Sequence, residues 1–425
     1  MRNFRDYDRT QRFLLPPDLS DWVADDDLAH FIVAAVERVD ISAFHVSRTG
    51  SGKAQYHPRM MLALLIYCYA SGIFSSRRIE RATHRDVSVR FIAANSHPDH
   101  DTIAKFRRDN IRAFEVAFEQ LLLLASEAGL LKVGTVSVDG TKIDANASKI
   151  KSIRYDRLQV LRAKLGEDIA ALTAKAEAAD LVPEDDGLSL PGEIVRRETL
   201  KAKLDAAEKR LEEAAARDHE GDDDPPAPEA SRQTNLTDPD SAIMRKSARH
   251  EYRQAYNAQA AVDADGSMLV VASDVLNTTN DRAGLDGLLN QMTDGSRSPK
   301  TLLADAGYAG EEVVKALEKC GIDPLIAISR QQHERPYDFR PPPKQGKSPK
   351  AITAQWRLDM IDKLQTEPAR KQYRKRKQTV EPVFGIIKSI LGFTRFHLRG
   401  IENVKSEWTL TTLAYNCKRL SKMMA

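Results

Sequence analysis

Three acidic residues occupy positions from which they could bind metal ions. Asp139 lies in the segment SVDGTKID, Asp305 follows the short apolar run 301–304, and Glu381 lies in TVEPVFGIIK. Ligands in open α/β sheets gather at the carboxyl ends of strands, and carboxylate oxygens are ligands that Mg²⁺ prefers. Two such ions about 3.5–4 Å apart can activate an attacking oxygen and stabilise a leaving one. The alternative is structural: strand-end aspartates often cap the next turn, and a glutamate in the first turn of a helix is commonly solvated.

Basic residues surround Glu381. Six of the eight residues in segment 370–377 (RKQYRKRK) are basic, and Tyr373 lies among them. Lys388 follows Glu381 by seven residues, which in a helix is nearly the same face. A basic run is usually a solvated helix face, but beside a candidate metal ligand it favours the binding of a polyanion such as nucleic acid. Further basic residues follow at Arg395, His397 and Arg399.

The composition of the whole chain conceals this basic segment. The 425 residues contain 64 Lys and Arg against 61 Asp and Glu, which leaves a net charge of +3 and excludes a histone-like polycation. Residues 370–399 hold nine basic residues and one acidic residue, whereas residues 181–230 hold fifteen acidic and seven basic residues. The two segments cancel in the sum.

Cysteine usage and hydropathy exclude two further classes of protein. Cys68, Cys320 and Cys417 lie far apart, which argues against a disulfide scaffold and a thiolate zinc site. The N-terminus is polar and charged, and the longest apolar run, 60–70, is shorter than the roughly 18 residues of a membrane span. We therefore expect a cytoplasmic protein with no membrane contact.

The pattern of apolar residues predicts the elements that must position the acids. Helical spacing runs through residues 1–130, and alternating β-branched and small residues predict a strand over 133–143. Asp265-Gly266 predicts a hairpin between two further strands. The remaining predictions are strands at 255–262, 268–275, 301–304 and 324–328, and helices at 281–292, 311–320, 353–391 (with a break at Pro368) and 402–423.

A large segment interrupts the predicted α/β core. Two amphipathic runs within residues 153–217 predict a helical hairpin, and residues 218–232 have the composition of an acidic linker. The predicted domains are an N-terminal helical domain at 1–130, a core at 131–152 and 233–400, the hairpin, the linker, and a C-terminal helix at 401–425.

Several motifs resemble those of bacterial insertion-sequence transposases of the DDE class. The N-terminal stretch YHPRMMLALLIYCYASGIFSSRRIE (56–80), with HPDHDTIAKFRR (97–108), is similar to the helical domain that precedes the catalytic core in one group of these enzymes. The resemblance implies an α/β fold with an RNase H-like mixed sheet, a helical N-terminal domain and a helical-hairpin insertion after the first strand. The core motifs are VSVDGTKIDANAS (136–148), DPDSAIMRK (238–246), YNAQAAVD (256–263), LLADAGYAGEE (302–312) and TVEPVFGIIKSILGFTRFHLRG (379–400).

The resemblance also implies roles for individual residues. Asp139, Asp305 and Glu381 would be the catalytic triad and would hold two Mg²⁺ or Mn²⁺ ions. The family has a signature of Tyr, Arg, the catalytic Glu and Lys with two, three and six intervening residues. Here Tyr373, Arg376, Glu381 and Lys388 give two, four and six. The changed middle spacing leaves Arg376 and Lys377 as equal candidates for the arginine position.

The expected partner is double-stranded DNA, both as the terminal inverted repeats of the element and as the target. Cutting two ends together implies at least a homodimer on DNA, in the bacterial cytoplasm and associated with the nucleoid. The expected reaction is cleavage at the element ends followed by strand transfer; the alternatives are an RNase H-like nuclease without strand transfer and a domesticated DNA-binding regulator. Residues expected to contact DNA are Tyr373, Arg376, Lys377, Lys388, Arg395, Arg399, Arg77 and Arg107.

Other polar residues near the motifs are left outside the predicted site. Asp144, five residues after Asp139, is expected to be a turn residue, and Asp281 is not assigned to the site although it could approach it. Asn257 and Gln259 are equally compatible with a core-and-surface alternation and with a contact to DNA. Asp99, between two histidines, is expected to start a helix and not to bind zinc.

Overall fold

The computed structural model describes residues 18–45, 55–179, 190–218, 227–245, 251–293, 298–328 and 352–424. The proline-rich segment 334–350 and most of the predicted acidic linker lie outside these ranges. The chain forms two compact units. The helical unit consists of residues 1–132, 385–393 and 409–425, and the sheet unit consists of residues 133–384 and 394–408.

Local capping explains where the helices of the helical unit begin. Pro58 occupies the first position of its helix, and the Asp99 side chain accepts a hydrogen bond from Thr102 N, as expected for a helix start. Gly72 ends a helix with φ +78°, and a side chain there would lie 2.9 Å from the Leu391 carbonyl oxygen, so glycine is required. The helices are α1 (Leu28–Glu37), α2 (Pro58–Ala70), α3 (Ser76–Arg85), α4 (Val87–Ile92), α5 (His100–Asp109) and α6 (Ile111–Glu127).

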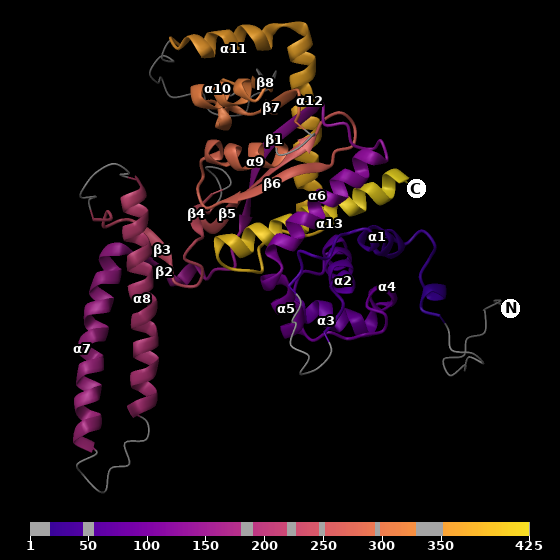
Figure 1. The fold of residues 1–425 in the computed structure, drawn as a ribbon. Coiled ribbons are helices and arrows are strands. Elements are labelled where there is room, and N and C mark those ends of the chain that lie inside the picture. Colours follow the sequence, from indigo (N-terminus) through magenta and orange to yellow (C-terminus); the bar gives the residue numbers. More distant parts are fainter. Residues whose placement is uncertain are drawn as a thin grey trace, which may run out of the picture. The chain divides into compact units, whose positions relative to one another are not determined.

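The sheet unit is built on the central strand β1 (Thr135–Asp144) (Figure 1). The strand β5 (Arg253–Asp263) pairs with it in antiparallel fashion, and β7 (Thr301–Ala304) pairs with it in parallel on the other side. β6 (Val270–Leu276) and the short β4 (Ala242–Met244) pair with β5, and β8 (Asp323–Ile326) pairs in parallel with β7. This strand order confirms the predicted α/β fold with an RNase H-like mixed sheet.

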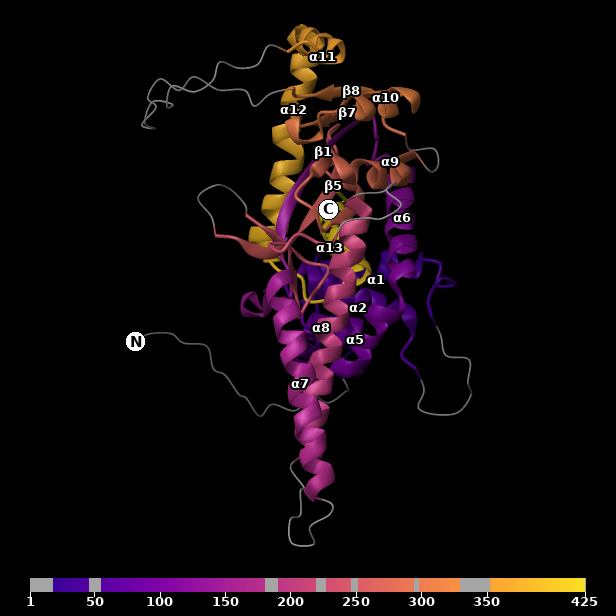
Figure 2. The same ribbon diagram turned by 90° about the vertical axis from the view of Figure 1, so that its left-hand side faces the viewer.

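Helices cover both faces of this sheet (Figure 2). Leu303 of β7 and Leu325 of β8 pack against Tyr373 and two other apolar side chains of the helices on one face. The first turns of the last helix contribute Trp408, which is fully buried and donates from Nε1 to the Gln259 carbonyl oxygen at 2.8 Å. The covering helices are α9 (Leu285–Thr293), α10 (Glu311–Lys319), α11 (Gln355–Gln365) and α12 (Glu367–Gly385). Of α13 (Ile401–Met424), only the residues up to Trp408 belong to the sheet unit.

Two long helices follow β1 in the sequence. α7 (Tyr155–Ala179) and α8 (Leu190–Asp218) lie side by side in both views (Figures 1 and 2). At one end of the pair, the short strands β2 (Ser152–Arg154) and β3 (Gln233–Asn235) pair with each other. The segment that joins the two helices lies outside the described residues. Ile153 of β2 joins Leu158 of α7 and Leu204, Ala207 and Leu211 of α8 in one buried apolar cluster.

Among the described helices, none is both long enough and apolar enough to cross a membrane.

Candidate active site

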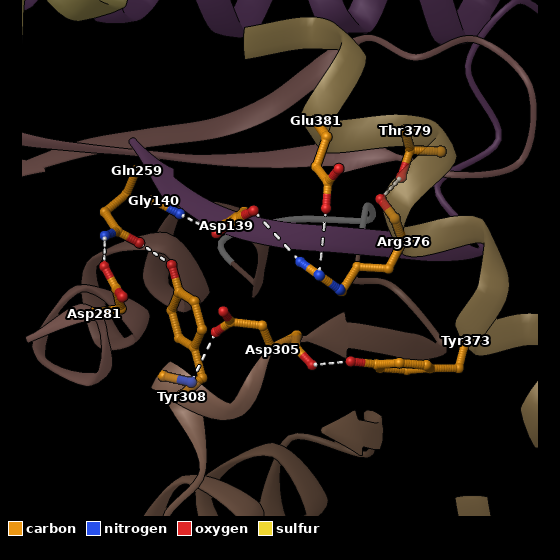
Figure 3. A network of polar contacts seen from close by, with 12 residues as sticks. Asp139, Gly140, Gln259, Asp281, Asp305, Tyr308, Tyr373, Arg376, Thr379 and Glu381 are labelled. Carbon is orange, nitrogen blue, oxygen red and sulfur yellow. Dashed lines mark hydrogen bonds and ion pairs between the residues drawn. The ribbon is translucent and has the colours of Figure 1, made fainter. Parts of the chain in front are cut away.

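The register of two parallel strands brings Asp139 and Asp305 together. Ser137 of β1 lies opposite Leu303 of β7, so the residues two positions further along, Asp139 and Asp305, point to the same face of the sheet. Asp139 Oδ1 accepts a hydrogen bond from its neighbour Gly140 N at 2.8 Å (Figure 3). Asp305 Oδ1 accepts one from Gly307 N at 2.8 Å and thereby caps the turn Ala306–Tyr308. The structural role expected of a strand-end aspartate is therefore present at Asp305.

The helix α12 brings an acid and a base to these aspartates. Glu381 lies in the interior of α12 and not in a first helical turn, the position considered under the structural alternative. Arg376 Nη1 lies 3.4 Å from Asp139 Oδ2, and its Nη2 lies 3.4 Å from Glu381 Oε1 (Figure 3). The Arg376 side chain is 10% exposed, whereas Lys377 lies on the exposed surface of the helix. Of the two candidates for the arginine position, Arg376 therefore contacts the acids.

A further acid, Asp281, lies beside this group. It begins the 3₁₀ turn Asp281–Gly284 after β6, and its Oδ1 accepts hydrogen bonds from Asn257 Nδ2 at 2.6 Å and Gln259 Nε2 at 3.1 Å (Figure 3). Asn257 and Gln259 come from β5, where Gln259 lies directly opposite Gly140. The sequence carries one signal for this arrangement: the polar pair Asn257 and Gln259 at alternate positions of a predicted strand, and the structure buries both.

The surroundings of Asp139 raise the pKa of its carboxyl group to about 6. Burial is the largest cause, and the charges of Asp305 and Asp281 act in the same direction, against the opposing effects of Arg376 and the Gly140 N–H. A divalent cation would offset the negative charges that Asp305 and Asp281 add to this buried carboxyl group.

The acids fit Mg²⁺ or Mn²⁺ by their chemistry, because all of them offer hard oxygen ligands. Within the described part of the chain, however, no group of three or more His, Cys, Asp or Glu side chains is arranged to hold a metal ion. The Arg376 guanidinium instead lies between Asp139 and Glu381 as the positive charge of the site. We infer that a metal ion shared by these two acids requires the guanidinium to move aside.

The other residues expected to contact DNA from the sheet unit have local partners. The Tyr373 hydroxyl donates to the Ala304 carbonyl oxygen at 3.2 Å, which holds α12 against β7. Arg395 Nη2 lies 3.8 Å from Asp144 Oδ2, and Arg399 Nε donates to the Asn146 carbonyl oxygen at 2.9 Å. Both arginines are exposed, so these contacts leave part of each side chain open to solvent. Asp144 ends β1 and forms ion pairs, and is not a turn residue.

The expected DNA contacts in the helical unit differ in exposure. Arg77 is exposed on α3, and Lys388 is half-buried in the π-helical turn Ile386–Ile390. Arg107 is only 4% exposed, and its Nη1 donates to the Tyr69 hydroxyl at 2.9 Å and to the Phe74 carbonyl oxygen at 3.0 Å. The Arg107 guanidinium joins α5 to the end of α2, which favours a structural role over the predicted contact with DNA.

Replacing Arg107 by Met should therefore destabilise the helical unit without a direct effect on DNA binding. Hydrogen bonds to a charged group contribute about 1.5–3 kcal/mol each, and the substitution leaves the Phe74 carbonyl oxygen without this donor. We expect the free energy of unfolding to fall by about 2–4 kcal/mol. Urea denaturation measures the change, and Arg77→Met on the exposed face of α3 serves as the matched control. If Arg107→Met left the stability unchanged and weakened DNA binding, Arg107 would be a DNA contact as the sequence predicts.

Two families of known proteins match the chain. The family described as "Transposase DDE domain" matches residues 229–417, and the family described as "Transposase domain (DUF772)" matches residues 17–109. No curated protein and no solved structure matches the chain. The first match includes Asp305, Asp281 and Glu381, whereas Asp139 precedes it, so the assignment of Asp139 depends on its position beside Asp305 in the sheet.

Proposed function

The chain belongs to the DDE transposases of insertion sequences, enzymes that act on DNA, and from this premise we propose that it cleaves DNA at the ends of its element and transfers the freed ends to a target. The observation that carries the proposal is the adjacency of Asp139 and Asp305 on neighbouring parallel strands, with Glu381 linked to Asp139 through Arg376. A regulator that only binds DNA has no use for such a group of acids on one face of a sheet.

We propose that Asp139, Asp305 and Glu381 hold two Mg²⁺ or Mn²⁺ ions. Bound divalent ions supply Lewis-acid polarisation of phosphodiester oxygens. The protein contributes fixed ligands: Gly140 N and Gly307 N orient the two aspartates through hydrogen bonds of 2.8 Å each. Arg376, once displaced from Asp139 and Glu381, would be free to pair with a phosphate oxygen of the DNA.

The exposed bases of α12 support a DNA strand held along this helix. Contacts of this kind offset phosphate charge and position the strand, but they do not read base sequence. We extend the proposal to exposed Lys377, Arg395, Arg399 and Arg77, to half-buried Lys388, and to the ring of Tyr373. Because both ends of an element must be cut together, we propose that the protein acts as a homodimer on DNA. The exposed bases on α12 are Arg370, Lys371, Arg374 and Lys377.

The direct test uses linear DNA that ends in the element's inverted repeats. With Mg²⁺ present, we expect cleavage at the repeat ends and joining of the freed 3′ ends to a second DNA, both detected on a denaturing gel. The control is the same DNA with scrambled ends, which should be neither cut nor joined. Cleavage without joining would identify a nuclease, and binding without cleavage would identify a DNA-binding regulator; either result contradicts the proposal.

A further inference from the structure

Asp281 fills the space beside two glycines that adjoin the catalytic aspartates. Gly140 directly follows Asp139, and a Cβ atom at this position would lie 2.6 Å from Asp281 Oδ1. Gly307 comes two residues after Asp305, and a Cβ atom there would lie 2.9 Å from Asp281 Oδ2 and 2.9 Å from Asp305 Oδ1. Neither position has room for a side chain: Gln259 Nε2 would lie even closer than Asp281 Oδ1 to a Cβ atom at Gly140, and the carboxylate oxygens of Asp281 and Asp305 occupy the space at Gly307. The two oxygens of one carboxylate thus lie beside Gly140, next to Asp139, and beside Gly307, two residues after Asp305. Figure 3 shows Asp281 together with Asp139, Gly140 and Asp305.

Three side chains fix the orientation of this carboxylate. The Tyr308 hydroxyl donates to Gln259 Oε1, so the amide nitrogen of Gln259 must point the other way, toward Asp281 Oδ1. Burial raises the pKa of Tyr308 well above its usual value, which keeps the hydroxyl protonated as a donor. Asn257 Nδ2 donates to the same Oδ1 at 2.6 Å. With Oδ1 held by two amides, Oδ2 is left on the side of Gly307 and Asp305.

The positive charges near Asp281 are directed elsewhere. Arg282, its sequence neighbour, donates to the Ala309 carbonyl oxygen. Arg376 pairs with Asp139 and Glu381. Among the described residues no ion pair is formed by Asp281 or by Asp305. Asp281 Oδ2 and Asp305 Oδ1 therefore lie on either side of the Cβ position at Gly307, and neither carboxylate has an ion pair with a basic side chain among the described residues.

We propose that Asp281 is a fourth acid of the candidate site and that its Oδ2 binds the same divalent cation as Asp305. The inference rests on the proposed function, because it assumes that Asp139 and Asp305 are metal ligands. It deepens that function by naming an acid outside the triad and the amides that orient it. Asn257 and Gln259 are then positioning residues of the metal site and not contacts to DNA.

The test is Asp281→Asn in the full-length protein without DNA. The new amide keeps an oxygen that can accept from Asn257 and Gln259, so the substitution removes charge and little else. We expect the affinity for Mn²⁺, measured by electron paramagnetic resonance of the free ion, to fall about 10-fold or more. The melting temperature in EDTA should be unchanged or higher, because one source of repulsion with Asp139 and Asp305 is removed.

Asp286→Asn, an equal loss of charge at an exposed position of α9, is the matched control and should leave Mn²⁺ binding unchanged. Unchanged Mn²⁺ affinity in Asp281→Asn would overturn the inference, and so would a lower melting temperature in EDTA, which indicates a structural role. Asp139→Asn separates this failure from failure of the proposed function. If Asp139→Asn weakens Mn²⁺ binding and Asp281→Asn does not, only the fourth acid is rejected; if neither does, the metal site itself is rejected.

Discussion

Replacing Asp139 by Asn should lower the rate of DNA cleavage by about three orders of magnitude or more while the protein remains folded. Loss of a metal ligand removes several kcal/mol of transition-state stabilisation, and each ~1.4 kcal/mol corresponds to a tenfold change in rate. The fold should tolerate the change, because the Asn oxygen can still accept the hydrogen bond from Gly140 N. Cleavage of repeat-ended DNA in single-turnover kinetics measures the effect.

Asp139→Asn should also change how the stability of the protein depends on pH. Burial raises the pKa of Asp139 to about 6, above that of an unfolded aspartate, so the carboxyl group stabilises the fold most when protonated and this contribution is lost as the pH rises through about 6. The neutral amide lacks this pH dependence. The melting temperature should therefore respond less to pH between about 4 and 7 in the variant than in the parent protein.

Asp144→Asn is the matched control for catalysis. Asp144 ends the same strand, and its Oδ2 lies 3.2 Å from Arg253 Nη1 and 3.8 Å from Arg395 Nη2, both of which are exposed. Exposed ion pairs contribute about 0–1 kcal/mol, so cleavage should stay within a few-fold of the parent rate. Equal losses in the two variants would mean that β1 is sensitive to any substitution, and full activity of Asp139→Asn would remove Asp139 from the site.

The sequence predicted five of the six strands of the sheet from alternating or short apolar runs, but not the three-residue strand β4 (Ala242–Met244). The apolar run 301–304 closes on Asp305, and β7 has these bounds in the structure. The alternation over 133–143 corresponds to β1, and the hairpin at Asp265-Gly266 joins β5 and β6. Once β1 and β7 are neighbours and parallel, the approach of Asp139 and Asp305 follows from the two-residue repeat of a strand.

The sequence was insufficient where contacts depend on side-chain reach. Arg376 and Glu381 are five residues apart, and residues at this spacing do not share a helix face, so only the long arginine side chain brings the two together. Arg107 lies in a segment rich in charged residues, yet tertiary packing buries it against Tyr69 and Phe74. Asp281 approaches the site only because Gly140 and Gly307 leave room for it, and no local pattern of residues encodes that space.

Arg376 also determines how the site behaves when no metal is bound. Its guanidinium contacts one oxygen of Asp139 and one of Glu381, and the Asp139 and Asp305 carboxylates each accept a backbone N–H. The acids that would hold metal ions are thus partly satisfied within the protein. A fold organised in this way does not need metal ions for its stability, although the proposed reaction does.

Chelation of divalent ions by EDTA should therefore lower the rate of DNA cleavage by about three orders of magnitude or more. The melting temperature should fall by no more than a few degrees. In Arg376→Gln, by contrast, Asp139 and Glu381 lose their counter-ion, and removing one partner of a largely buried ion pair is strongly destabilising. The exposure of Glu381 reduces that cost, and we expect about 1–3 kcal/mol, measured as a lower melting temperature in EDTA.

Added Mn²⁺ then distinguishes a counter-ion from a simple structural contact. In Arg376→Gln the metal no longer competes with the guanidinium for Asp139 and Glu381, so Mn²⁺ should raise the melting temperature by more than it does in the parent protein. Lys377→Gln removes an equal charge from the exposed face of the same helix and should respond to Mn²⁺ as the parent does. If Mn²⁺ stabilises Arg376→Gln no more than the parent, the guanidinium does not occupy the place of a metal ion, and its contacts with the two acids serve only to hold α12 against the sheet.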